Sequence, residues 1–190
     1  MTLELYRQVR ELIVAALKHA DFFGAYRRCE WNLKPIAECI IQYYTLRPER
    51  IFYAFENAHI AKLASVYAWF TDVPVLFVSG KAEQQRALQE RQYGWSGIVG
   101  TVCHWGRAAL DDRGRAMDRF DYRVALVGGG VDGKILTADA KAAGGVGIDF
   151  GNGIGRVIQL DAEGIDAWDW PKFPKYGSDT GKEQAAHPPC

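Results

Sequence analysis

Apolar positions along the chain recur with two spacings, which together predict alternating helices and strands. Near the N-terminus, apolar residues three and four positions apart predict an amphipathic helix over residues 3–20. Pro35 suits an early position of a second helix, which we expect to run to about Leu46. The aromatic stretch DFFGAYRRCEWNLKP between them follows neither spacing, so we expect irregular structure there.

From residue 50 onward, short and nearly continuous apolar runs alternate with helical patterns. The predicted strands are 50–55, 73–80, 96–105, 122–128 and 145–151, with RVIQL (156–160) as a last short strand. The predicted helices between them are 57–70, 81–92, 106–120 and 131–144. This alternation predicts an α/β, Rossmann-like fold: a largely parallel sheet with helices on both faces, preceded by an N-terminal helical segment.

The length and composition fit one folded domain. We expect a single α/β domain over residues 1–170 and a flexible C-terminal tail over 171–190, which is rich in Pro, Lys and Gly. Lys plus Arg and Asp plus Glu both total 23, so the formal net charge is zero and no general nucleic-acid patch is expected. The four cysteines are widely spread and form no CxxC pair, which argues against a disulfide scaffold or a structural zinc site.

Neither a signal peptide nor a membrane span is expected from the sequence. The first segment carries charges among its apolar positions, and no stretch reaches the roughly 18 uncharged apolar residues that a spanning helix needs. We therefore expect a cytoplasmic protein.

The predicted strands indicate where a ligand would bind. In open parallel sheets, ligands bind beyond the carboxyl ends of the strands. Glu56 and, one turn into the next helix, His59 follow the first of these strands, Lys81 follows the second, and Asp149 closes the fifth. Polar residues thus collect where a nucleotide-type ligand would lie, although loops after strands are polar in general.

A glycine-rich turn follows the fourth strand. Gly128, Gly130 and Gly133 form a G-x-G-x-x-G between a strand-like and a helix-like run. Such a turn can bring backbone N–H groups close to a phosphate at a helix N-terminus; the alternative is a tight turn in which glycine only permits close packing. Because the motif lies late in the chain instead of at the first strand, an NAD or FAD enzyme is disfavoured.

Each candidate side chain has a functional and a structural interpretation. Asp149 suits a hydrogen bond to a ribose hydroxyl or a role as a base, or else a turn before Gly151. Lys81, in VSGK, suits a phosphate contact or a solvated helix start. The Asp21 carboxylate suits the binding of a metal-diphosphate or the deprotonation of an acceptor hydroxyl. The structural alternative is that Asp21 caps or turns the chain. His59 suits a catalytic or sugar-binding role, or else a buried hydrogen-bonded histidine.

The order of these segments resembles the GT-D glycosyltransferases. The resemblance rests on ADFFGAY after an opening helix, NAHIA, VPVLFVSGKAEQQRAL, and the late YRVALVGGGVDG and GIDFGNG segments. It implies a Rossmann-like fold that transfers sugar from a nucleotide-sugar donor, usually with a divalent metal such as Mn²⁺ or Mg²⁺. The Asp-x-Glu metal signature of that family is absent: Asp21 lies in the corresponding region, but no Glu follows two positions later.

We therefore predict a glycosyltransferase that takes a nucleotide-sugar donor. The predicted donor-binding residues are Lys81, Gly128, Gly130, Gly133 and Asp149. The predicted catalytic residues are Asp21, Glu56 and His59. Two alternatives stay open: a phosphoribosyltransferase-like or other nucleotide-processing enzyme, and a non-catalytic nucleotide-binding module. The missing Asp-x-Glu favours the module, whereas the density of polar residues at the strand ends opposes it.

Overall fold

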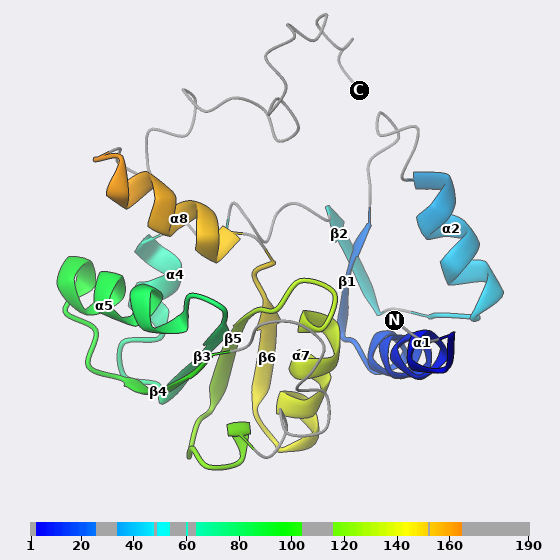
Figure 1. Ribbon diagram of the computed structural model, residues 1–190, viewed down its shortest axis with the longest axis horizontal. Coiled ribbons are helices and arrows are strands. Elements are labelled where there is room, and N and C mark those ends of the chain that lie inside the picture. The colour runs from blue at the N-terminus through cyan, green and yellow to red at the C-terminus, as the bar shows by residue number, and fades with distance from the viewer. Residues whose placement is uncertain are drawn as a thin grey trace, which may run out of the picture.

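The computed structural model describes residues 3–25, 34–47, 49–53, 60, 64–103, 116–151 and 153–164. Figure 1 shows the elements in chain order. The helices are α1 (Leu3–Lys18), α2 (Lys34–Tyr43), α4 (Ala64–Trp69), α5 (Ala82–Tyr93), α7 (Gly133–Ala142) and α8 (Gly153–Ala162). The strands are β1 (Phe22–Ala25), β2 (Arg50–Tyr53), β3 (Val75–Ser79), β4 (Ile98–Cys103), β5 (Val124–Gly128) and β6 (Val146–Asp149).

Four of the strands form a parallel sheet in the order β4-β3-β5-β6. Ser79, the last residue of β3, pairs with Cys103 on one side and with Gly128 on the other. Because every pair is parallel, the carboxyl ends of all four strands meet at one edge. The chain runs from β3 outward to β4 and then returns to β5 on the other side of β3, so the strand order reverses between β3 and β5. The predicted parallel sheet is confirmed.

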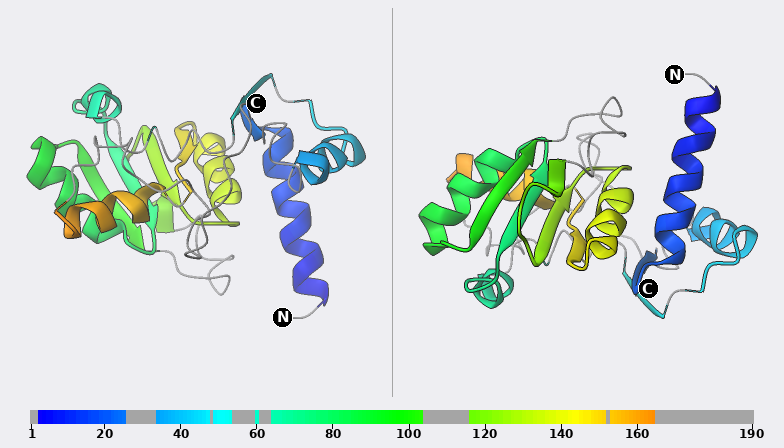
Figure 2. Two further views of the ribbon diagram at one scale, coloured as in Figure 1. Left: turned by 90° about the horizontal axis from the view of Figure 1, so that it is seen from above. Right: turned by 90° about the horizontal axis from the view of Figure 1, so that it is seen from below.

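Helices cover both faces of this sheet, as predicted. Successive residues of a strand point to opposite faces, and the cores divide accordingly. Phe77 of β3 packs in a cluster with Ala82 of α5 and Ile154 of α8, whereas Leu76 and Val78 pack with Leu136 of α7 on the other face. Figure 2 shows α5 and α8 on one side of the strands and α7 on the other. This double burial explains why β3 and β5 are continuously apolar.

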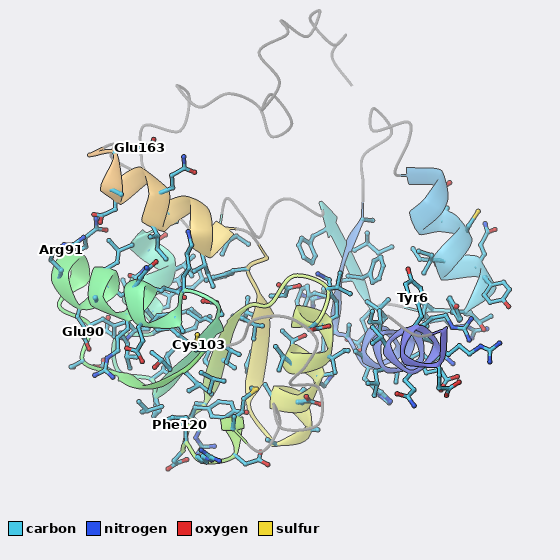
Figure 3. All side chains as sticks on the ribbon, viewed as in Figure 1. Tyr6, Glu90, Arg91, Cys103, Phe120 and Glu163 are labelled. Atoms are coloured by element: carbon cyan, nitrogen blue, oxygen red, sulfur yellow. The ribbon has the colours of Figure 1, made fainter. Side chains whose placement is uncertain are left out.

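The helices α5 and α8 are also joined at their C-terminal ends. Arg91 of α5 donates to Asp161 of α8 over 2.6 Å, and Gln92 donates to the other carboxylate oxygen over 2.9 Å. Figure 3 labels Arg91 on α5 and Glu163, which directly follows α8. In the part of the chain that the structure describes, no helix is both long and apolar enough to span a membrane.

The predicted last strand over 156–160 is wrong, because these residues lie within α8. Val157 and Ile158 are β-branched and favour strands in isolation. With Ile154, however, they form an apolar stripe at spacings of three and four. Ile154 and Ile158 pack in the core cluster on the sheet, and Val157 is buried. The burial that helical spacing provides therefore outweighs the local strand preference.

The prediction of irregular structure after the first helix is wrong for Phe22–Ala25. These residues form β1, which pairs in parallel with β2 in a separate two-stranded sheet. Arg50 of β2 also lies over the Phe22 ring, 5.5 Å from its centroid. The strand depends on a partner about 28 positions later in the chain, so no local pattern marks it. It also follows that β2 is not part of the four-stranded sheet.

The N-terminal segment is joined to the core through α7. Helix α1 packs against α7, and Lys141 near the end of α7 donates to the Asp21 carboxylate over 2.7 Å and to the His19 carbonyl over 2.8 Å. Figures 1 and 2 show α1 beside α7 in each view. The fold therefore has a four-stranded core and a smaller segment attached to one of its helices.

Candidate functional site

The point where the strand order reverses lies between the carboxyl ends of β3 and β5. A crevice forms there in open α/β sheets, because the loops that leave the two strands run to opposite sides. The residues that follow these strands are Gly80–Lys81 and Gly129–Asp132, and Asp149 ends the neighbouring strand β6. The structure therefore brings five of the eight predicted site residues to one edge: Lys81, Gly128, Gly130, Gly133 and Asp149.

The β3 end places Lys81 at this edge. The Ser79 side chain is buried, and its hydroxyl oxygen accepts a hydrogen bond from the Lys81 backbone N–H over 3.1 Å. This bond turns the chain directly from the strand into α5, which begins at Ala82. Lys81 is exposed, so its ammonium is available to a ligand beside the crevice. Cys103 ends the adjacent strand β4 (Figure 3), with its sulfur 3.9 Å from the Gly80 carbonyl oxygen.

Two positions of the glycine turn favour glycine for different reasons: Gly128 has close neighbours, and Gly130 has a left-handed backbone conformation. A Cβ at Gly128 would lie 2.9 Å from Ile154 Cδ1 and 3.2 Å from Ser79 Cβ. Gly130 has a φ of +59°, a left-handed conformation that favours glycine. Among the described residues, the N–H groups of Gly129, Gly130 and Val131 have no hydrogen-bond acceptor. These groups are therefore available to bind an anion.

Asp149 is held against the start of α7. One carboxylate oxygen accepts from the Gly151 N–H over 2.8 Å, and the other lies 2.8 Å from the Lys134 ammonium. A Cβ at Gly133 would lie 3.0 Å from the Asp149 carboxylate, so glycine permits this close approach. The positive end of the helix dipole favours a carboxylate in this position. Asp149 thus has the structural role in a turn that the sequence allows, and its carboxylate also lies at the carboxyl edge of the sheet.

Lys134 is the residue that the sequence analysis missed. Its ammonium bridges the Asp149 carboxylate and the Gly130 carbonyl oxygen, which lies 3.1 Å away. It therefore connects the glycine turn to the end of β6. The signal in the sequence was a lysine directly after the last glycine of G-x-G-x-x-G, in the first turn of the predicted helix.

Of the three predicted catalytic residues, Asp21 is the one that the structure describes, and it does not lie at this edge. Asp21 pairs with Lys141, seven residues after Lys134 and therefore about 10 Å further along α7. It lies near the amino ends of the strands, opposite to Asp149. Glu56 and His59 lie outside the described residues; they follow β2, which belongs to the two-stranded sheet.

The described side chains do not form a divalent-metal site. Among these residues, no group of three or more His, Cys, Asp or Glu side chains could hold a metal ion. Two carboxylates belong to this edge: Asp132, which is buried in the glycine turn, and Asp149, on which the Lys134 ammonium already lies. A hard cation such as Mg²⁺ or Mn²⁺ prefers several oxygen ligands with negative charge, and a lysine paired with the carboxylate competes with such an ion.

One comparison with known proteins identifies a family. A family model described as GT-D fold-like domain matches residues 6–157. The match extends from α1 into α8 and includes the glycine turn, Lys134 and Asp149. It confirms the resemblance found in the sequence, and with the parallel sheet it confirms the α/β, Rossmann-like fold. Searches among curated proteins and among solved structures find no match.

Proposed function

The chain belongs to the GT-D fold-like domain family, and from this premise we propose that it is a glycosyltransferase with a nucleotide-sugar donor. The donor would lie across the carboxyl edge of the four-stranded sheet, between β3 and β5. The observation that carries this proposal is the glycine turn, whose three available N–H groups lie at the point where the strand order reverses.

The edge offers groups that suit the diphosphate and the sugar hydroxyls of such a donor. The N–H groups of Gly129, Gly130 and Val131 would bind the diphosphate, and Lys81 would contribute a positive charge from the β3 side. Asp149 would accept a hydrogen bond from a hydroxyl group of the ribose or of the transferred sugar. A carboxylate accepts such a bond well, whereas it would repel a phosphate.

The proposed chemistry is the displacement of a diphosphate by a hydroxyl group. The bond between the anomeric carbon and the diphosphate oxygen breaks, the acceptor oxygen forms the new bond, and the acceptor loses its proton to a base. Backbone N–H groups and one ammonium would stabilise the charge that develops on the leaving diphosphate. Glu56 and His59 remain the predicted candidates for the base, whereas Asp21 is paired with Lys141 at the other end of α7. A divalent metal remains a prediction that the family resemblance suggests.

A non-catalytic nucleotide-binding module is the second candidate. Two observations favour it: the sequence lacks Asp-x-Glu, and the described side chains form no metal-binding group. The two candidates share the donor site, so they differ in turnover and not in binding.

A thermal-shift panel tests donor binding first. The panel contains UDP-, GDP-, CMP- and dTDP-linked sugars, NAD and phosphoribosyl pyrophosphate, each with and without Mn²⁺. A ligand at about 100 times its Kd adds about 2.7 kcal/mol to the free energy of unfolding, so we expect a clear rise in Tm with one nucleotide-sugar family. Lys81→Met should reduce the rise, whereas Lys141→Met, at the opposite end of α7, should leave it unchanged.

The other outcomes separate the alternatives. A rise with phosphoribosyl pyrophosphate alone would support the nucleotide-processing enzyme, and a rise with NAD alone would contradict the proposal. No rise with any ligand would contradict donor binding. Once a donor is known, release of free nucleotide on incubation with candidate acceptors distinguishes a transferase from a binding module.

A further inference from the structure

We propose that Lys134 is a positioning residue that sets the charge of the donor site. By pairing with Asp149, it allows an anionic diphosphate to lie on the adjacent glycine turn. This inference rests on the proposed function, and it deepens that function by assigning a role to a residue that neither the motif nor the family match singles out.

Lys134 connects the two parts of the site. Its ammonium lies 2.8 Å from Asp149 Oδ2 at the end of β6 and 3.1 Å from the Gly130 carbonyl oxygen in the turn. The same carbonyl accepts from the Gly133 N–H over 3.3 Å. The described chain has no cis peptide bond, so the N–H of Val131 points away from a Gly130 carbonyl that faces Lys134. Lys134 therefore holds the turn with this N–H directed away from the Lys134–Asp149 pair.

Charge balance is the second part of the argument. The Asp149 side chain is only 18% exposed, so water screens its charge incompletely. The carboxylate also lies against the first turn of α7, where it already uses the favourable end of the helix dipole. Without Lys134, a diphosphate on the turn would meet the negative charge of Asp149 without the ammonium that lies 2.8 Å from this carboxylate. With Lys134, the two side chains sum to zero charge.

A direct phosphate contact is the rival explanation for Lys134. An ammonium has three N–H donors, and the side chain is 43% exposed, so a contact of that kind is sterically open. The two explanations differ in what happens when Asp149 loses its charge. If Lys134 acts by cancelling the carboxylate, then removal of that carboxylate makes Lys134 unnecessary. If Lys134 binds the phosphate itself, its loss cannot be repaired in this way.

The experiment is a double-mutant cycle with Lys134→Met, Asp149→Asn and the double variant. The probes are UDP, GDP, dTDP and CMP, with uridine and guanosine as phosphate-free counterparts, and the affinity is measured by calorimetry. Asparagine keeps an oxygen that accepts from the Gly151 N–H, so the turn is retained. Lys141→Met is the matched control: it lies on the same helix, is similarly exposed at 47%, and is also paired with an aspartate.

We expect Lys134→Met to weaken nucleotide binding by on the order of tenfold or more, which corresponds to about 1.4 kcal/mol. Asp149→Asn added to it should restore the affinity to within about threefold of the wild-type chain, a coupling of the size that interacting side chains show. Nucleoside binding should change little with Lys134→Met. Lys141→Met should leave every affinity unchanged.

Three results would overturn the inference. A double variant as weak as Lys134→Met would show that Lys134 contacts the phosphate, and an equal loss for nucleosides would show a general collapse of the turn. Both leave the proposed function intact. If the wild-type chain binds none of the probes and none of the nucleotide sugars, the proposed function itself is wrong, and the inference fails with it.

Discussion

The two ends of α7 carry the same pair of side chains in different surroundings. At the first end, Lys134 lies 2.8 Å from Asp149, and at the other end Lys141 lies 2.7 Å from Asp21. The first pair lies beside the glycine turn where the strands end, and its carboxylate is mostly covered. The second joins the N-terminal segment to the core, and its carboxylate is 55% exposed. The comparison teaches that the surroundings, and not the residue types, distinguish a candidate site from a structural contact.

The helix dipole makes the two lysines unequal as well. The positive end of α7 lies near Lys134 and disfavours an ammonium, whereas the negative end lies near Lys141 and favours one. Lys134 therefore depends on its carboxylate partner more than Lys141 does. A lysine in an electrostatically unfavourable position, held beside available N–H groups, fits the proposal that this end binds an anionic ligand.

The largest expected effect comes from a substitution in β6 that forces α7 away from the sheet. The sheet supports both ends of this helix. A Cβ at Gly147 would lie 2.4 Å from the Thr137 carbonyl oxygen and 2.6 Å from its Cα. These are backbone atoms, so the helix itself must move. We expect Gly147→Ala to lower the free energy of unfolding by about 3 kcal/mol, at the upper end of the usual cost of overpacking. Urea unfolding measures this change.

Gly145→Ala provides a graded comparison in the same segment. Its Cβ would lie 3.2 Å from the Arg123 carbonyl oxygen and 3.2 Å from Tyr122 Cε2. These distances are tight but less severe, so we expect a smaller loss than for Gly147→Ala. Equal losses for the two variants, or no loss for Gly147→Ala, would show that α7 does not lie this close to β6.

A smaller effect is expected at the amino edge of the sheet, near the C-terminal end of α7, where Lys141 joins the N-terminal segment to this helix. Lys141→Met removes the contacts to Asp21 and to the His19 carbonyl. Both side chains are about half exposed, so we expect a loss in unfolding free energy of less than about 1 kcal/mol at low salt. Asp21→Asn removes only the ionic contact and should cost less. If neither variant loses stability at low salt, or if 1 M NaCl leaves the loss unchanged, the ion pair contributes nothing.

The smallest effect is a pH dependence at the same end of the sheet. Burial raises the pKa of the Tyr122 phenol above its usual value, and the carboxylates of Asp118 and Asp139 raise it further. The folded chain therefore keeps the neutral phenol longer than the unfolded chain does. The resulting stability is complete below the unfolded pKa of about 10 and is lost as the pH rises through the higher folded pKa.

Tyr122→Phe removes this ionisation, so it is the control against which the wild-type chain is compared. Other groups titrate in the same range, so the comparison is between the two proteins at each pH. Between pH 8 and pH 11, the wild-type chain should lose more unfolding free energy than Tyr122→Phe. Equal losses would contradict the raised pKa.

The sequence predicts the core of the fold well because that core has strong patterns. The apolar runs of β3 and β5 are buried on both faces, and helical spacing of apolar residues marks α1. The patterns fail where pairing or burial is not local. Residues Phe22–Ala25 become a strand only because Arg50–Tyr53 lies beside them. RVIQL becomes a helix because that geometry buries Val157 and packs Ile158 against the core.

The site is predictable to the same extent. The rule for strand ends groups Lys81, Gly128 and Asp149 correctly, because β3, β5 and β6 are neighbours in one parallel sheet. The rule does not place Asp21, because no local pattern in the sequence indicates which end of α7 this residue will contact. Lys134 was missed because its role depends on contacts to Gly130 and Asp149, which only the folded turn brings together.

Amide hydrogen exchange with and without a nucleotide sugar tests the central claim most directly. The ligand is the member of the thermal-shift panel that raises Tm most, and exchange is followed peptide by peptide. The account predicts slower exchange at residues 79–81, 129–134 and 149–151, with no change at 18–23 and 139–147. Protection at 18–23 without protection at 129–134 would place the ligand at the other end of α7 and contradict the account.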